Sequence, residues 1–132
     1  MAKSFEELAI FQDARELTKK IYALTEAEPW RSDFRFVAQI HAAAGSIADN
    51  IAEGFEREGN KEFINFLYYA KGSCGETRSQ VIRAYDVKFI DKETYESLYG
   101  DCLALSRKIS KFITSLKDSG LGGSKFKGQG SK

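Results

Sequence analysis

The chain has 132 residues, of which 42% are hydrophobic and 30% are charged, a composition typical of one folded domain and not of a disordered segment. Lysine and arginine number 20 against 19 aspartates and glutamates, so the net charge of +1 gives no global signal for nucleic-acid or membrane binding. The single proline, Pro29, leaves long stretches free to be helical, because proline breaks helices internally.

The sequence also bears on location and redox state. No stretch approaches the roughly 20 apolar residues that span a bilayer. No apolar run follows a basic segment near residue 1, as it would in a signal peptide. We therefore expect a cytoplasmic protein that does not bind membranes and whose two cysteines, Cys74 and Cys102, are reduced.

The first helix is predicted over residues 5–27, because Pro29 and Trp30 interrupt the pattern that precedes them. Ser4 and Glu7 have the spacing of a capping box, in which each side chain satisfies a free amide at a helix start. Apolar residues then recur at alternating steps of four and three, which places one face toward a core; they are Ile10, Ala14, Leu17, Ile21 and Leu24.

The second helix is predicted over residues 33–53, with Ser32 as its cap and Gly54 as the left-handed residue that commonly ends a helix. Its apolar stripe consists of Val37, Ile40, Ala44, Ile47 and Ile51. Small residues lie beside that stripe and would let another helix approach closely; they are Ala38, Ala42, Ala43, Gly45 and Ala48.

The third helix is predicted over residues 61–88 with Asn60 as its cap, and the fourth from the cap Asp91 to about Leu116. The stripe of the third helix is Phe63, Leu67, Ala70, Cys74, Thr77, Val81 and Ala84. The stripe of the fourth helix keeps the alternation of three and four throughout; it is Tyr95, Leu98, Cys102, Leu105, Ile109, Phe112 and Leu116. Such spacing is typical of helices that pack at a shallow angle.

These four stripes predict an all-α fold, an antiparallel up-down-up-down four-helix bundle over residues 1–118. Residues 119–132 differ in composition, because they hold five glycines and three lysines and no acidic residue. We expect this segment to be a flexible tail.

No pattern indicates an enzyme, and we expect no cofactor, no bound metal and no catalytic residue. A di-iron bundle needs Glu-x-x-His pairs, but Ala38 precedes the only histidine, His41, by three positions. A phosphate-binding loop needs a lysine directly after its second glycine, and after Gly59 that position is Asn60. His41 is interpreted as a partly buried hydrogen-bonding group, and both cysteines as buried thiols in neighbouring helices.

A polar group surrounds the turn between the second and third helices, and it comprises Asn50, Glu53, Gly54, Arg57 and Glu62. It allows two interpretations. The group is either a polar functional site or a set of hydrogen bonds and ion pairs that satisfies the helix ends, and we favour the second.

The start of the third helix is apolar on nearly every side, which normally indicates a helix buried all round. Four of its residues lie beside the predicted core stripe; they are Ile64, Phe66, Tyr68 and Tyr69. They either cover the chain's own loops or contact another subunit, and we favour self-association.

Basic residues lie along the third and fourth helices, with acidic residues interspersed. A solvated face of mixed charge is the simplest interpretation. The alternative is a nucleic-acid-binding surface, which would require these cations to line up; its candidates are Arg78, Arg83, Arg107, Lys108 and Lys111.

Several segments together resemble a known family. They are FQDA at 11–14, SIADNIAEG at 46–54, Arg57, EFINFL at 62–67 and AKGSCGE at 70–76. In order and spacing they resemble the bacterial four-helix-bundle proteins first met in intervening sequences of 23S rRNA genes. They also resemble the related accessory variability protein of diversity-generating retroelements.

The resemblance covers about residues 5–116 and implies an up-down-up-down bundle, a ring-shaped homopentamer and no enzymatic activity. The retroelement relatives are basic and bind nucleic acid and a reverse transcriptase. Here residues 1–118 carry a net charge of −2, because the three lysines of residues 119–132 account for more than the total of +1. Two functions therefore follow as hypotheses: a homo-oligomeric scaffold or adaptor, and, as the alternative, a nucleic-acid-binding accessory protein.

Overall fold

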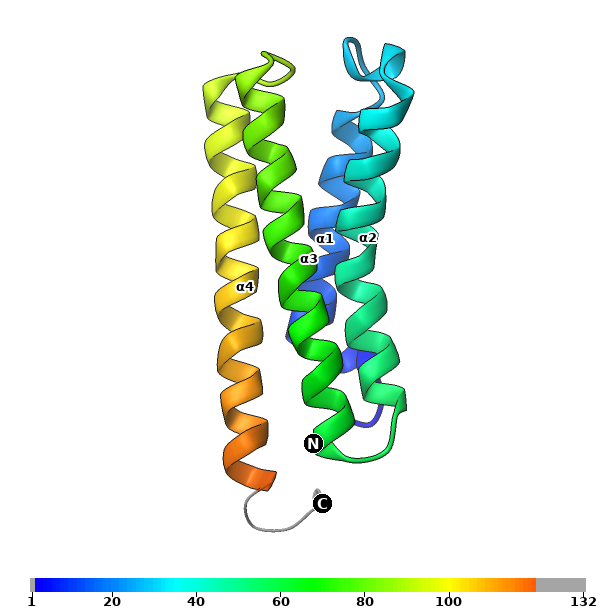
Figure 1. The fold of residues 1–132 in the computed structure, drawn as a ribbon, viewed down its shortest axis with the longest axis vertical. Coiled ribbons are helices and arrows are strands. Elements are labelled where there is room, and N and C mark those ends of the chain that lie inside the picture. Colours follow the sequence, from blue (N-terminus) through cyan, green and yellow to red (C-terminus); the bar gives the residue numbers. More distant parts are fainter. Residues whose placement is uncertain (1, 121–132) are drawn as a thin grey trace.

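The computed structural model describes residues 2–120, and most of them lie in four long helices (Figure 1). The elements are η1 (Phe5–Glu7), α1 (Ala9–Leu24), η2 (Trp30–Ser32), α2 (Phe34–Glu56), α3 (Asn60–Asp86) and α4 (Lys92–Gly120), where η denotes a short 3-10 helix. No strand occurs within residues 2–120. The prediction of an all-helical fold with four helices is therefore confirmed.

Each helix packs beside the next one along the chain, and α4 also contacts α1 (Figure 1). Residues 57–59 join α2 to α3 at one end of the bundle, and residues 87–91 join α3 to α4 at the opposite end. α3 therefore lies between α2 and α4 and packs against both.

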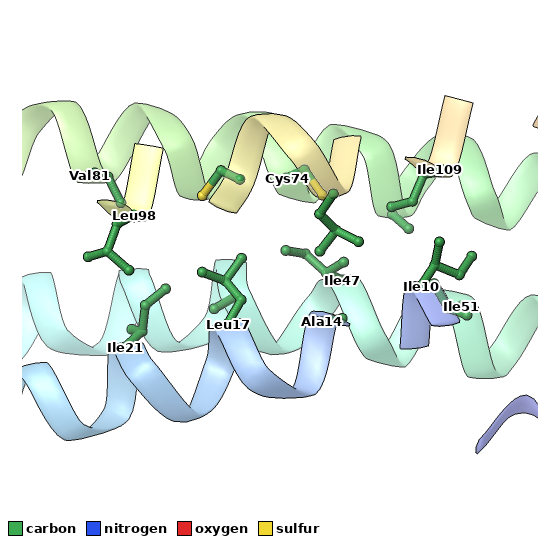
Figure 2. Packing of buried hydrophobic residues seen from close by; sticks show 14 of the residues in the cluster. Ile10, Ala14, Leu17, Ile21, Ile47, Ile51, Cys74, Val81, Leu98 and Ile109 are labelled. Carbon is green, nitrogen blue, oxygen red and sulfur yellow. The ribbon is translucent and has the colours of Figure 1, made fainter. Parts of the chain in front are cut away.

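The core is formed where the four apolar stripes meet (Figure 2). The predicted stripe of α3 is buried at every position, and so are most of the other predicted positions. In α2, Phe36 is buried and Val37 is only half-buried, and in α4 Ile113 is buried beside a half-buried Phe112. An α-helix has 3.6 residues per turn, so a strict heptad stripe drifts around a straight helix and the buried face moves to the adjacent residue.

An aromatic cluster closes the end of the bundle where η2 lies. Trp30, of which only 1% is exposed, has its ring centroid 4.8 Å from that of Phe36 and 5.2 Å from that of Phe89. Phe36 lies in the first turn of α2, and Phe89 lies between α3 and α4, so the single tryptophan of the α1–α2 connection packs against the α3–α4 connection.

The predicted start of the first helix is wrong. Residues 5–7 form η1, and α1 begins only at Ala9, because Leu8 has an extended backbone (φ −77°, ψ 129°). The Ser4 side chain forms no capping hydrogen bond, and the Glu7 carboxylate accepts one from the Lys3 amide at 3.2 Å. The break lets Phe5 fold back onto Phe11, with ring centroids 4.9 Å apart. At its other end α1 stops at Leu24, three residues earlier than predicted.

The cap of α2 is Asp33, and the prediction of Ser32 is wrong. An Asp33 carboxylate oxygen accepts a hydrogen bond from the Phe36 amide at 3.0 Å, which satisfies a free N–H in the first turn. The Ser32 hydroxyl instead donates to the Glu28 carboxylate at 2.7 Å.

Gly54 does not end α2, and the prediction of a left-handed conformation there is wrong. The helix continues to Glu56, and the glycine with a positive φ is Gly59, at +96°. Gly54 is required for another reason. A β-carbon on it would lie 2.6 Å from the β-carbon of Phe66 and 3.0 Å from Cδ1 of Phe63, so only glycine lets α2 and α3 approach this closely.

Gly59 also takes the capping position of α3 that was predicted for Asn60. The Asn60 side-chain amide donates instead to the Leu116 carbonyl at 3.3 Å, which ties α3 to α4. The prediction of Asp91 as a cap is confirmed, because its carboxylate accepts from the Thr94 amide at 2.8 Å. That bond lowers the pKa of the Asp91 carboxyl, because it stabilises the charged form.

The third and fourth helices end at other residues than predicted. α3 ends at Asp86, two residues early, and α4 continues to Gly120. The first two residues of the predicted tail therefore belong to α4, and the rest of it, residues 121–132, lies outside the described residues.

Candidate interaction surfaces

His41 lies between α1 and α2 and is a hydrogen-bonding group, as predicted. Its Nε2 atom is 2.8 Å from the Thr25 hydroxyl, and its ring stacks on Tyr22 with centroids 3.7 Å apart. Burial lowers the pKa of the imidazole from its ordinary value, because the charged form loses hydration. The ring is thus held by contacts that a structural histidine makes.

Both cysteines are buried thiols, as predicted, and both are free. Burial raises the pKa of Cys74 and that of Cys102 to about 12, because a thiolate in the core would lose its hydration. A thiol with such a pKa is protonated at neutral pH and is a poor nucleophile.

Two further findings concern residues 2–120. No group of three or more histidine, cysteine, aspartate or glutamate side chains in that part of the chain is placed to hold a metal ion. None of the helices described combines the length and apolar character that a membrane span requires.

The polar group at the α2–α3 turn is an ion-pair arrangement. The Arg57 guanidinium lies 2.9 Å from the Glu53 carboxylate and 3.8 Å from that of Glu62, so it joins the end of α2 to the start of α3. Asn50 does not belong to this arrangement. Its side-chain amide donates to the Ser46 carbonyl and hydroxyl, both at 2.9 Å, one turn earlier in α2.

The four apolar candidates on α3 lie in different surroundings. Ile64 is half-buried against the chain's own core, and Phe66 is covered partly by the Arg57 guanidinium, 4.9 Å from its ring centroid. Tyr68 and Tyr69 are 46% and 59% exposed. The Tyr68 hydroxyl accepts a hydrogen bond from the Lys117 ammonium of α4 at 2.7 Å, so Tyr69 has the freest ring of the four.

Small residues continue this surface along α3. Gly72 follows the two tyrosines by about one turn and Gly75 by about two. A β-carbon on either would meet no atom within 4 Å outside the helix's own backbone. We call Tyr68, Tyr69, Gly72 and Gly75 the α3 face. The sequence analysis selected the aromatic residues of this surface but missed the two glycines. They could have been found from their spacing, because residues three apart lie on the same side of a helix.

Four of the five basic candidates line one groove between α3 and α4, which has a volume of about 560 Å³. They are Arg78, Arg107, Lys108 and Lys111, and they share it with Lys71, Leu103, Ser106 and Ser110. No ion pair within residues 2–120 involves Lys71, Arg78, Arg107 or Lys111. We call these four residues the basic groove.

Two of the five basic candidates have polar partners on other helices. The Lys108 ammonium lies 2.7 Å from the Asp13 carboxylate of α1, although its side chain also borders the basic groove. Arg83 donates to the Gln39 side chain at 3.2 Å and lies over the Phe36 ring, on the side of α3 that faces α2. The predicted set of five therefore does not form a single surface.

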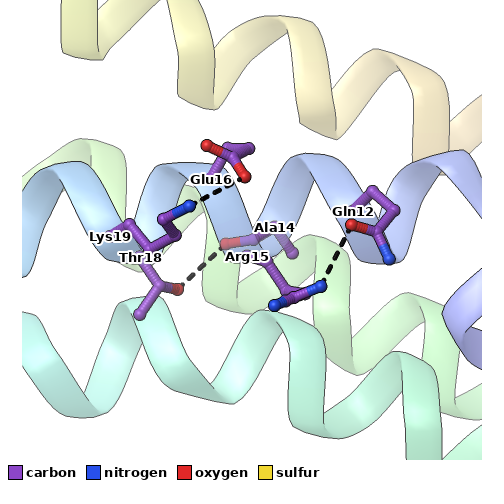
Figure 3. Close-up of polar contacts among 6 residues, drawn as sticks. All are labelled: Gln12, Ala14, Arg15, Glu16, Thr18 and Lys19. Carbon is purple, nitrogen blue, oxygen red and sulfur yellow. Dashed lines mark hydrogen bonds and ion pairs between the residues drawn. The ribbon is translucent and has the colours of Figure 1, made fainter.

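The outer surface of α1 provides a contrast (Figure 3). Two of its cations are engaged within their own helix, since Lys19 lies 3.3 Å from Glu16 and Arg15 donates to Gln12 at 3.2 Å. Pairs of this kind are typical of a solvated helix face. They set the basic groove apart as a concentration of cations without carboxylate partners.

An apolar groove that the sequence patterns did not predict lies at the end of the bundle with the α2–α3 turn. It has a volume of about 560 Å³, and most of its surface is apolar. Its lining residues are Ala2, Leu8, Phe55, Arg57, Gly59, Asn60, Phe63, Phe112, Ser115, Leu116 and Ser119. The signal in the sequence was that Leu8 and Phe55 are apolar but lie outside the predicted stripes.

The family profile described as 23S rRNA-intervening sequence protein matches residues 6–111, which span all of α1, α2 and α3 and most of α4. The chain belongs to this family. The first part of the predicted resemblance is thereby confirmed. No functionally curated protein matches the chain.

A solved structure with the same fold comes from Bacteroides thetaiotaomicron and is described as a protein with unknown function from the S23 ribosomal protein family. It is 24% identical, it covers 80% of this chain and 98% of its own, and the TM-score is 0.74. At this identity the likeness shows the fold alone. The family profile supports the rRNA-gene family, and the retroelement relationship stays a prediction.

Proposed function

We propose that this member of the 23S rRNA-intervening sequence family is a non-enzymatic subunit of a homo-oligomer and works as a scaffold or adaptor. In this proposal its helices form an up-down-up-down bundle whose α3 face contacts another copy. The observation that carries it is an exposed aromatic pair, Tyr68 and Tyr69, followed by the open positions Gly72 and Gly75 on the same helix.

The physical case rests on two features of this face. Aromatic side chains are enriched at protein interfaces, because they bury a large area at a small cost in conformational entropy. Glycines without neighbours leave room for a second helix at short distance, as small residues do wherever helices approach closely. If this face binds a different surface of the next copy, repetition of the contact forms a ring when the rotation between copies closes. The expected number of five subunits comes from the family resemblance.

Light scattering on the intact chain at micromolar concentration tests the proposal. The expected mass is about five times the 14.8 kDa of one chain. Two variants locate the interface. Tyr69→Ser removes the most exposed ring of the face, and Gly72→Leu adds a side chain that has space in the single subunit but blocks a neighbouring helix. Both are expected to shift the mass toward the monomer.

Matched controls use the same changes elsewhere. Phe34 is 83% exposed at the far end of α2, so Phe34→Ser removes an even more exposed ring outside the face. Gly100 of α4 is as open as Gly72, so Gly100→Leu adds the same side chain. Both controls should keep the oligomer. A monomeric parent chain contradicts self-assembly, and an oligomer that only the controls dissociate contradicts the α3 face.

A second candidate function is binding of nucleic acid, for which the basic groove is the specific support. Lys71, Arg78, Arg107 and Lys111 meet there from two helices, with two serine hydroxyls between them. Cations without carboxylate partners are available to phosphates, and each phosphate they contact releases counterions. Along α4 the groove extends over about nine residues, roughly 13 Å, which is long enough for about two backbone phosphates.

Fluorescence anisotropy with a labelled single-stranded RNA, titrated at several salt concentrations, tests this second candidate. Arg107→Gln with Lys111→Gln should weaken binding and lower the slope of log K against log salt by about 1 to 2. Arg15→Gln with Lys19→Gln removes the same charge from α1. This control should reduce both the affinity and the salt slope by less than the groove variant does. No binding by the parent chain at low salt rules the candidate out.

A further inference from the structure

The apolar groove at the end of the bundle has a floor of core side chains open to solvent on one side. Leu8, Phe63, Phe112 and Leu116 form much of it, and they come from three different parts of the chain. Phe63 and Leu116 are at the same time members of the buried core. An apolar ligand in this groove would therefore extend the core by a further layer.

The rim of this groove is acidic on the side of the α2–α3 turn. Residues 53–62 hold four glutamates against two cations, Arg57 and Lys61. The Arg57 guanidinium is neutralised, since it lies 2.9 Å from Glu53 and 3.8 Å from Glu62. Glu56 and Glu58 are exposed and alternate along the chain with the lining residues Phe55, Arg57 and Gly59. The groove thus suits a segment that combines an apolar side chain with positive charge.

Such a segment follows directly from the groove in the sequence. Ser119, close to the end of α4, is one of the lining residues. After Gly120, the last residue of α4, the chain continues with residues 121–132, LGGSKFKGQGSK. This segment carries three lysines and no acidic residue, and Phe126 stands between Lys125 and Lys127. Phe126 lies six positions after Gly120, the last residue of α4, enough for an extended chain to reach about 20 Å.

We propose that residues 121–132 dock in the apolar groove of their own chain, with the Phe126 ring on the apolar floor and Lys125 and Lys127 beside Glu56 and Glu58. The covalent attachment at Ser119 favours this occupant over any free one, because a short linker gives an effective concentration on the order of millimolar.

This inference is independent of the proposed function, since none of its residues belongs to the α3 face or to the basic groove. Nuclear magnetic resonance of the full chain with labelled methyl groups tests it. The expected result is a nuclear Overhauser contact between the Phe126 ring and the methyl groups of Leu8 or Leu116. Phe126→Ala should abolish the contact and shift those methyl signals.

The matched control is Gln129→Ala, which changes the same segment without removing the ring or a charge and should leave the methyl signals in place. Glu56→Lys with Glu58→Lys should move them toward the positions seen in Phe126→Ala, as should raising the salt concentration. A sample that mixes labelled and unlabelled chains shows which chain supplies the ring. Absence of the contact, or a contact seen only between different chains, overturns the proposal.

Discussion

The interface between α2 and α3 differs in kind from the seam between α1 and α4. Between α2 and α3, Gly54 lies against Phe66, and the Ser73 hydroxyl donates to the Ser46 hydroxyl at 2.9 Å. Between α1 and α4, exposed ion pairs bridge the helices, each at 2.7 Å, and they join Lys20 to Asp101 and Lys108 to Asp13. A groove of about 200 Å³ runs along this seam, and the same charged residues line it.

This difference indicates which of the two helix interfaces contributes more to the stability of the fold. Close packing leaves no room for an added atom, because protein interiors are as dense as organic crystals. An exposed ion pair exchanges its partner for water at little cost, so its net contribution is small. We therefore expect α2–α3 to set the stability of the bundle and α1–α4 to tolerate change.

The largest expected effect comes from Gly54→Ala. The added β-carbon would lie 2.6 Å from the β-carbon of Phe66. The backbone fixes the position of a β-carbon, which no side-chain rotation can move, so the two helices must separate. We expect the free energy of unfolding to fall by about 1–3 kcal/mol. Urea titration followed by circular dichroism measures this change.

Gly45→Ala is the matched control, because it lies in the same helix and its β-carbon would meet nothing within 4 Å. It should stabilise the protein by about 0.5–1 kcal/mol, since alanine loses less backbone entropy in a helix. Equal effects of the two substitutions would show that α2 and α3 do not approach as closely as described.

A smaller effect is expected at the α1–α4 seam. A double-mutant cycle on Lys20→Ala and Asp101→Ala should give a coupling energy of about 0.2–1 kcal/mol, because both side chains remain well exposed. The coupling should shrink in 1 M salt, where charges are screened. A coupling above about 2 kcal/mol would contradict the contrast between the two seams.

The smallest effect is a pH dependence from His41, which joins α1 to α2. Its pKa is lowered in the folded chain by burial, so below the ordinary value of 6.5 the unfolded chain binds a proton that the folded chain resists. Stability is therefore full above about pH 6.5 and decreases as the pH falls toward 5. His41→Gln should flatten this slope in urea titrations at pH 7.5 and 5.5. An unchanged slope would assign the dependence to other groups.

Periodicity predicted the core because burial follows directly from the spacing of apolar residues along a helix. All seven stripe positions predicted in α3 are buried. Helix ends were predicted less well, because several residues competed for each cap. The cap of α2 is Asp33 and not its neighbour Ser32, and the capping position of α3 is Gly59 and not Asn60. Gly54 was assigned the wrong role, since a glycine for close approach and a glycine for a turn look the same in a sequence.

The candidate surfaces were predicted only in part, because a surface depends on which helices become neighbours. Arg78 and Arg83 are five residues apart in one helix, yet one borders α4 and the other contacts α2. The apolar groove joins residues from both ends of the described chain, Ala2 and Ser119 among them. No local pattern carries that information.

The position of Trp30 has a practical consequence for all these measurements. It is the only tryptophan, it is buried, and it lies at the end of the bundle where α2 begins, whereas Gly54 lies near the end of that helix. Its fluorescence therefore reports on one end of the molecule, while circular dichroism averages over all helices. Unfolding curves that coincide for the two signals would show that both ends melt as one unit, and curves that separate would reveal a bundle that opens first at the α2–α3 turn.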